Sequence, residues 1–257
     1  MRINLTGQRA LVLGASGGLG AAIARGLGEA GARVAVSSRS ADKLDAQFPD
    51  HETFPKLVAD LTASGIGRTI ADRALSLLGG VDILINNSGG PPPTSALGAT
   101  DEQWRAQFDA MVMSLVDLTG ALVPGMRERR WGRVITVASS GIVAPIPNLA
   151  LSNALRSALL GWSKTLASEV AADGVTVNMV LPGRIATSRV EALDKANAAR
   201  TGKSMEEVEK AALATIPAGR YGEPDEFAAA AVFLASRQAA YITGTTIRVD
   251  GGALRNV

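Results

Sequence analysis

The sequence predicts an α/β fold in which a doubly wound parallel sheet is covered by helices on both faces. Apolar runs typical of buried strands alternate with segments of helical periodicity along the whole chain, and this βαβα order is typical of parallel sheets. The first strand, residues 9–13, leads into a turn with Gly14, Gly18 and Gly20, and then into a helix over residues 21–30. Such a turn presents free N–H groups and the positive end of a helix dipole, which suit a pyrophosphate. The alternative is a tight turn that binds no ligand.

The remaining elements follow in chain order without a linker or an internal repeat, so residues 1–257 are expected to form one domain. The further strands are predicted over residues 33–38, 54–59, 81–86, 133–138, 175–181 and 246–249. The further helices are predicted over residues 41–47, 64–78, 101–123, 149–172 and 223–235. Two irregular insertions, 91–93 and 183–220, follow the carboxyl ends of strands, where such sheets bind ligands.

Composition excludes several classes of function. The chain has 257 residues, 47% of them hydrophobic, and a net charge of +2, which is too small to indicate a nucleic-acid or membrane partner. Cysteine is absent and His51 is the only histidine, in a polar connection where it is expected to be solvated. A histidine-based triad and a metal site are therefore not expected. With no secretory segment and no apolar run of membrane-spanning length, we expect a cytoplasmic protein.

The end of the second strand indicates which dinucleotide is bound. Proteins of this layout that bind NAD carry an acidic residue here for the ribose hydroxyls, whereas this chain has Ser38 followed by Arg39. A guanidinium and a hydroxyl would bind a 2′-phosphate that a carboxylate would repel. The sequence therefore favours NADP(H) over NAD(H), the alternative being an ordinary surface arginine. Asp60, after the third strand, is expected either to accept a hydrogen bond from the adenine amino group or to cap the next helix.

Six motifs in register give the chain a family resemblance. They are the glycine turn, Asp60-Leu-Thr, Asn86-Asn-Ser-Gly, Ser139, Pro182-Gly and the stretch from Tyr241 to Gly252. Together they resemble the short-chain dehydrogenase/reductases, and most of all the 3-oxoacyl-acyl-carrier-protein reductase branch. The resemblance implies a Rossmann-type fold with a seven-stranded sheet, a nicotinamide cofactor and a homotetramer or homodimer. It assigns cofactor binding to Gly14, Ser16, Gly17, Gly18, Leu19, Gly20, Ser38, Arg39, Asp60, Leu61, Asn87, Gly89, Asn153, Pro182, Gly183, Ile185 and Thr187.

The proton-transfer part of the site departs from this family. Its members usually carry Tyr-x-x-x-Lys on the helix after the fifth strand, and an asparagine on the helix after the fourth. The corresponding positions here hold Leu149, Asn153 and Met111, and only the family's serine remains, as Ser139. The two tyrosines, Tyr221 and Tyr241, are not followed four residues later by lysine, so the pair is missing in any alignment.

Three residues are candidates for the chemistry that remains. Ser139 is expected to polarise a substrate oxygen, or to be a remnant hydroxyl at a strand end. Asn153 can bind a ribose hydroxyl but brings no charge. Arg156 lies one helical turn beyond Asn153 and is expected to supply the missing positive charge, or to be a packing or interface residue. Arg184 is another candidate for that charge.

The sequence thus predicts an NADP(H)-dependent oxidoreductase that transfers a hydride to or from a carbonyl or alcohol, with an unusual proton source. The alternative is a non-catalytic NADP(H)-binding sensor or assembly protein on the same fold. Residues 188–215 are expected to form helices of a mobile lid over a small-molecule substrate.

Overall fold

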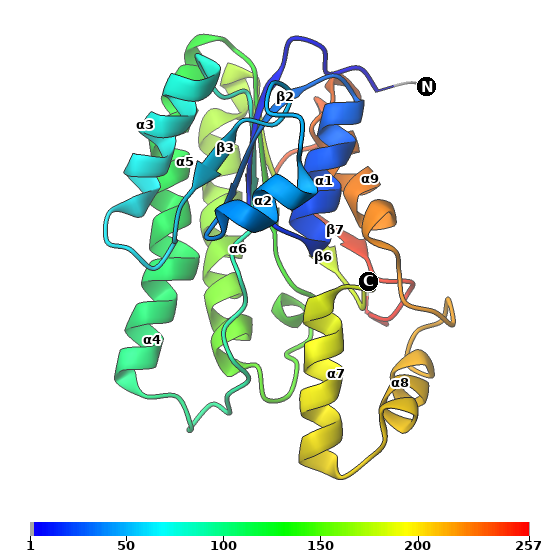
Figure 1. Cartoon of the computed structure of the whole chain (residues 1–257). Coiled ribbons are helices and arrows are strands. Elements are labelled where there is room, and N and C mark those ends of the chain that lie inside the picture. The colour runs from blue at the N-terminus through cyan, green and yellow to red at the C-terminus, as the bar shows by residue number, and fades with distance from the viewer. Residues whose placement is uncertain (1–2, 257) are drawn as a thin grey trace.

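A single parallel sheet organises the computed structural model, which describes residues 3–256 (Figure 1). Its seven strands run in the order β3-β2-β1-β4-β5-β6-β7, and every neighbouring pair is parallel. The strands are β1 Arg9–Leu13, β2 Arg33–Ser38, β3 Lys56–Val58, β4 Ile83–Asn86, β5 Gly132–Val137, β6 Val175–Pro182 and β7 Thr246–Val249. The predicted doubly wound α/β fold is confirmed.

Helices cover both faces of this sheet. They are α1 Gly18–Glu29, α2 Ala41–Gln47, α3 Ile66–Leu78, α4 Asp101–Phe108, α5 Ser114–Glu128, α6 Ala150–Val170, α7 Ser188–Thr201, α8 Met205–Leu213 and α9 Pro224–Leu234. In Figure 1, α1 and α9 lie side by side on one face, and α3, α5 and α6 lie on the other. Helices α7 and α8 project below the sheet as a separate pair.

The apolar strands fill two cores, one on each face. Successive side chains of a strand point to opposite faces, so Leu11 and Leu13 pack toward α3, α5 and α6. Ala10 and Val12 pack toward α1 and α9. A strand buried on both faces needs an unbroken apolar run rather than alternation, which explains the runs that predicted these strands.

The long helix predicted over residues 101–123 differs from the structure in two ways. A π-helical turn, Asp109–Met113, separates α4 from α5, and α5 continues to Glu128 with Pro124 inside it. The expected end before Pro124 was wrong: the apolar face of α5, with Leu122, Val123 and Met126 buried, packs against the fold on both sides of the proline. This tertiary packing outweighs the hydrogen bond that a proline removes.

The same stretch, residues 101–128, is long and apolar enough by composition alone to cross a membrane. Half of its most apolar window is buried inside the fold, as expected for a core helix of a globular domain. The packing of α5 against α3 accounts for its apolar residues.

The strand order indicates where the site lies. The order in which the strands are added to the sheet reverses at β1, which pairs with β2 on one side and β4 on the other. In such sheets a crevice opens where the connections leave in opposite directions. The glycine turn after β1 and residues 87–90 after β4 flank this crevice, so the two motifs expected to bind the cofactor lie next to each other.

The opposite, amino edge of the sheet is held by a cluster of charges around Asp82. This buried carboxylate accepts hydrogen bonds from Arg9 Nε at 2.7 Å, Arg9 Nη2 at 2.8 Å and Arg129 Nε at 3.0 Å. Burial alone would raise the pKa of Asp82, but the hydrogen bonds and charge of Arg9 hold it below its ordinary value. The cluster ties the start of β1 to the start of β4.

We expect Asp82→Asn to lower the free energy of unfolding at pH 7 by about 1–3 kcal/mol, because charge-assisted hydrogen bonds are lost. A carboxylate with a lowered pKa stabilises the fold above its unfolded pKa, and this contribution disappears as the pH falls through the folded pKa. The difference between wild type and variant should therefore shrink below about pH 4. Urea unfolding of wild type and variant at pH 7 and below about pH 4 measures this difference in the free energy of unfolding. Asp72→Asn on the exposed side of α3 is the control, and equal unfolding free energies at pH 7 would contradict the prediction.

Candidate functional site

The glycine turn leaves the N-terminus of α1 open. The helix begins at Gly18, its N-cap Gly17 provides no side-chain hydrogen bond, and its first turn contains no acidic residue. Asn87, just after β4, donates from Nδ2 to the carbonyl oxygens of Leu13 at 3.2 Å and Gly14 at 3.4 Å. The hydrogen bonds from Asn87 thus hold the turn in place, while the N–H groups of the turn stay available to an anion.

At two positions of this crevice, no contact within the chain requires glycine. A Cβ at Gly17 or Gly89 would meet no atom within 4 Å, and the φ of 166° at Gly17 is extended backbone that any residue adopts. At Gly14, by contrast, a Cβ would lie 2.6 Å from the carbonyl oxygen of Asn87. The open space beside Gly17 and Gly89 fits a dinucleotide that must approach the backbone closely.

The end of the crevice where the sequence predicts the adenosine is formed by residues that follow β2 and β3. Ser38 is buried, and its hydroxyl accepts from the amide of Ser40 at 3.2 Å. Arg39 is exposed and makes no hydrogen bond or ion pair within residues 3–256. Asp60 accepts from the amide of Thr62 at 3.0 Å. That hydrogen bond chiefly lowers the pKa of Asp60, and the charge of Arg39 adds to the effect.

These contacts show that one of the two roles expected of Asp60 is wrong and leave the other untested. Asp60 does not cap α3, because that helix begins at Ile66 with Gly65 as its N-cap. Its proposed contact with the adenine stays a prediction. Arg39 remains free to bind a 2′-phosphate.

The catalytic candidates Ser139 and Asn153 meet around Gly141. A Cβ at Gly141 would collide with Asn153 Oδ1 and lie 3.3 Å from Ser139 Oγ. Ser139 Oγ accepts from the amide of Gly141 at 3.1 Å. Asn153 donates from Nδ2 to the carbonyl of Ile146 at 2.9 Å and accepts from the amide of Ile146 at 3.3 Å. Asn153 therefore holds the loop before α6, a role that the sequence does not indicate.

Leu149 and Met111 are the other two residues predicted to depart from the family. Leu149 is the N-cap of α6 and pairs with Thr94 across an isolated bridge. Met111 is 2% exposed within the π-helical turn. Neither side chain can exchange a proton, and π-helical turns are frequent at functional sites. Of Ser139, Asn153, Leu149 and Met111, only Ser139 carries a hydroxyl.

Of the two candidate cations, only Arg156 lacks an acidic partner in the described part of the chain. Arg184 forms an ion pair with the buried Asp194, and its Nη1 lies 3.4 Å from the hydroxyl of Tyr221. Its charge is thereby compensated. Arg156 is 7% exposed and donates to two carbonyl oxygens, those of Val137 at 2.8 Å and Ser88 at 3.4 Å.

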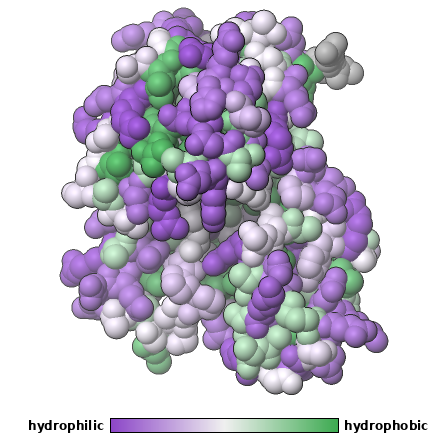
Figure 2. All heavy atoms as spheres, viewed as in Figure 1, coloured by the Kyte–Doolittle hydropathy of each residue, from purple (hydrophilic) through white to green (hydrophobic). Residues whose placement is uncertain are grey.

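The expected lid consists of α7 and α8, separated from the body by a recess in the surface view (Figure 2). Thr187 caps α7 and lies against Gly18, so the lid starts at the glycine turn. Asp194 accepts from Tyr221 Oη at 2.9 Å, and burial followed by this hydrogen bond raises the pKa of Tyr221. Arg189 donates to the carbonyl of Pro91 at 2.9 Å, which connects the lid to the loop after β4.

Sequence reasoning missed Asp194 and Arg189, because charged residues on a predicted lid helix resemble a solvated face. The remaining predicted cofactor residues line the same edge of the sheet. Gly20 and Ile185 are buried, and Ser16, Leu19, Leu61, Pro182 and Gly183 are half-buried. A Cβ at Gly183 would lie 2.6 Å from the Cα of Asp250. Their contacts with a cofactor stay predictions. His51 is exposed, as expected.

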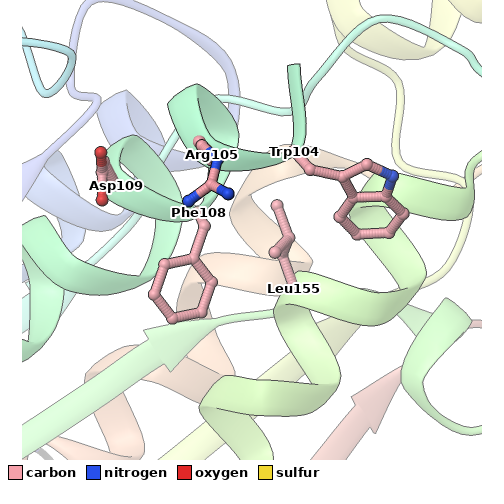
Figure 3. A pocket seen from close by; sticks show the side chains of 5 residues that line it. All are labelled: Trp104, Arg105, Phe108, Asp109 and Leu155. Atoms are coloured by element: carbon pink, nitrogen blue, oxygen red, sulfur yellow. The ribbon is translucent and has the colours of Figure 1, made fainter. Parts of the chain in front are cut away.

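A hollow of about 390 Å³ lies apart from this crevice, between α4 and α6 (Figure 3). Trp104, Arg105 and Phe108 of α4, Asp109 of the π-helical turn and Leu155 of α6 line it. Figure 3 shows Phe108 and Leu155 directed toward each other. None of the predicted cofactor-binding residues lines this hollow.

A family model described as enoyl-(acyl carrier protein) reductase matches residues 14–253. The chain belongs to the short-chain dehydrogenase/reductase family. It is 38% identical to the 3-oxoacyl-[acyl-carrier-protein] reductase FabG of Vibrio cholerae, over 97% of this chain and 98% of that protein. It is 36% identical to FabG of Escherichia coli, over 97% and 98% of the two chains.

Solved short-chain dehydrogenase/reductase structures share the whole fold. The L-sorbose reductase of Gluconobacter frateurii, complexed with NADPH and L-sorbose, superposes with a TM-score of 0.93 at 32% identity, covering 100% of both chains. YwfH, an NADPH-dependent reductase involved in bacilysin biosynthesis, gives a TM-score of 0.92 at 28% identity, covering 97% of this chain and 99% of that one. The NADPH of these two reductases agrees with the cofactor that Ser38 and Arg39 predict.

Proposed function

We propose that the protein is an NADP(H)-dependent oxidoreductase that transfers a hydride to or from a carbonyl or alcohol substrate without a tyrosine as proton donor. The observation that carries the proposal is the open crevice at the switch point of the sheet. It combines an uncapped helix N-terminus, two glycines facing free space and an unpaired Arg39. Named reductases among the relatives support the activity.

Each part of the crevice has its own task in this proposal. The N–H groups at the start of α1 bind the pyrophosphate, and Arg39 with Ser38 binds the 2′-phosphate. Asn87 keeps the glycine turn in place. When bound, NADPH supplies the hydride, and this chemistry requires mainly orientation from the protein.

At the substrate end, Ser139 donates a hydrogen bond to the substrate oxygen while Gly141 N–H orients that hydroxyl. Water supplies the proton that converts the alkoxide left by hydride transfer into the alcohol. Leu149 leaves the position of the family's tyrosine without an acid. A positioned acid contributes about 10²–10⁴-fold to such a reaction. We therefore expect slow reduction of ordinary ketones and acetoacetyl thioesters.

Binding and turnover are tested separately. At 100 times its Kd, NADPH should stabilise the fold by about 2.7 kcal/mol, a rise of about 5–10 °C in melting midpoint. Absorbance decay of NADPH with a panel of ketones, 2-oxo acids and thioesters measures turnover. No thermal shift would contradict the cofactor assignment. A shift without turnover on any substrate would favour the non-catalytic alternative instead.

The homotetramer or homodimer implied by the family resemblance, and the cytoplasmic location, stay predictions. Light scattering tests the first, and a stable monomer of 26.4 kDa would contradict it.

A further inference from the structure

The lid helix α7 buries a single side chain, and that side chain is charged. Of its residues Ser188–Thr201, Asp194 alone is buried, with 4% of its surface exposed. Among the described residues, neither hydrophobic core includes a member of α7 or α8, and in Figure 1 the two helices project away from the sheet. The cores that hold the other helices therefore do not extend into the lid.

The buried carboxylate of Asp194 is bound by two side chains from outside the lid. Arg184 Nη1 forms an ion pair with Asp194 Oδ1, and Tyr221 Oη donates to Asp194 Oδ2 at 2.9 Å. Arg184 Nη1 also lies 3.4 Å from Tyr221 Oη. These three residues form what is called the latch below. A carboxylate is costly to bury unless it is paired and hydrogen-bonded, and the latch meets both conditions with residues of the chain alone.

The latch joins the lid to the turn after β6. Arg184 belongs to residues 182–187, four of which are predicted to bind the cofactor. This turn is bound in addition to the segment before α9, because Gly222 N–H donates to the carbonyl of Arg184 at 2.9 Å and Ala186 N–H donates to the carbonyl of Gly222 at 2.8 Å. Asp194 thus connects α7 to two chain segments that already hold each other.

In the proposed function, this turn faces the nicotinamide half of the cofactor. Ser38 and Arg39 follow β2, whereas residues 182–187 follow β6, on the other side of the switch point at β1. A dinucleotide extends across the switch point, so its two ends meet different segments of the chain. A change in the latch is therefore expected to reach one end of the cofactor and not the other.

Other polar contacts of α7 are more exposed than the latch. Arg189 is exposed in the first turn of the helix and donates from Nη2 to the carbonyl of Pro91 at 2.9 Å. This acceptor is neutral, and a hydrogen bond of this kind contributes less than one between two charged groups. Lys195 and Glu191 form an exposed ion pair within α7 itself, which binds no other segment. The latch is therefore the strongest connection of α7 to the body.

We propose that Asp194 is a positioning residue, which fixes the lid helix to the cofactor-binding turn through Arg184 and Tyr221, so that the lid is ordered before any ligand binds. Because the latch consists only of residues of the chain, it needs no ligand to form. Because Arg184 belongs to the turn, breaking the latch loosens the turn together with the lid, and the affinity for the nicotinamide half of the cofactor falls. This last step rests on the proposed function, whereas the order of the lid does not.

Hydrogen exchange of the ligand-free protein, followed by mass spectrometry, tests the latch itself. We expect peptides of α7 to be protected in wild type, and Asp194→Asn to speed their exchange about 10- to 150-fold, because charge-assisted hydrogen bonds are lost. Arg184→Met leaves a buried carboxylate without its counter-ion, so it should speed the exchange further. Adding Asp194→Asn to Arg184→Met should then restore part of the protection. Glu191→Gln, which breaks the exposed ion pair of the same helix, is the matched control and should leave the exchange of α7 unchanged.

Two ligands measure the effect on the cofactor. Adenosine 2′,5′-bisphosphate carries only the adenosine half of NADPH, so its Kd should be the same for wild type and Asp194→Asn. The Kd of NADPH should rise at least about 5-fold in this variant. Tyr221→Phe keeps the ion pair and should change both the exchange of α7 and the Kd of NADPH in the same direction but less. An equal loss of affinity for both ligands in Asp194→Asn would overturn the positioning role.

The latch is refuted if α7 of ligand-free wild type exchanges as fast as an unfolded chain, or if Asp194→Asn leaves its exchange unchanged. Faster exchange in Arg189→Met together with none in Asp194→Asn would assign the order of the lid to the contact with Pro91 instead. If wild type binds neither ligand, the proposed function fails, while the exchange of α7 still decides whether the latch holds the lid. Tyr221→Phe provides the same comparison if Asp194→Asn does not fold.

Discussion

Leu149→Tyr combined with Asn153→Lys is expected to raise the turnover of acetoacetyl thioesters by about 10²–10⁴-fold over wild type. The pair would restore a proton donor and a cation that lowers its pKa. Because Ser139 Oγ and Asn153 both lie against Gly141, the lysine would be installed near the hydroxyl that orients the substrate oxygen. NADPH absorbance decay measures the gain.

The gain should exceed the product of the two single changes, since the lysine acts through the tyrosine. Asn153→Lys alone breaks both hydrogen bonds with Ile146, so we expect it to loosen the loop before α6 without adding activity. Leu149→Phe with Asn153→Lys is the matched control, because it supplies the ring and the charge but no hydroxyl. Equal rates for the phenylalanine and tyrosine variants, or fast turnover by wild type, would refute the prediction.

Arg39→Ala should raise the Kd of NADPH about 10- to 150-fold and leave the Kd of NADH nearly unchanged. A charge-assisted hydrogen bond contributes about 1.5–3 kcal/mol, which corresponds to that range of affinity. Arg39 is exposed and unpaired within the described residues, so its loss removes no contact of the fold. Fluorescence titration of both cofactors measures the two constants.

Two further variants sharpen this measurement. Arg39→Lys keeps the charge and should retain most of the NADPH affinity. Ser38→Asp places a carboxylate where NAD-binding proteins carry one, and should shift the preference toward NADH. A wild-type preference for NADH, or an equal loss of both cofactors in Arg39→Ala, would show that Arg39 does not recognise the 2′-phosphate.

The sequence by itself determined the architecture, because its signals are local. Unbroken apolar runs such as residues 10–13 specify strands buried on both faces, and the glycine turn before α1 follows from four glycines within seven residues. Since alternation of strands and helices admits few topologies, the parallel sheet followed. The missing Tyr-x-x-x-Lys pair is likewise a property of residue order alone.

Helix ends were less predictable where long-range packing overrides local preference. Pro124 normally ends a helix, yet α5 continues to Glu128 because its apolar face is packed on both sides of the proline. The π-helical turn at Asp109–Met113 leaves no periodicity that distinguishes it from an ordinary helix.

Only the tertiary structure decided which charged groups are free. Arg184 and Arg156 are equivalent candidates in the sequence, but the fold pairs Arg184 with Asp194 and leaves Arg156 buried beside two strand ends. Arg189 approaches the loop after β4 from a lid helix about a hundred residues further along the chain. The free energy of a charge depends on the partners and the solvent around it, and chain segments that are distant in sequence supply both.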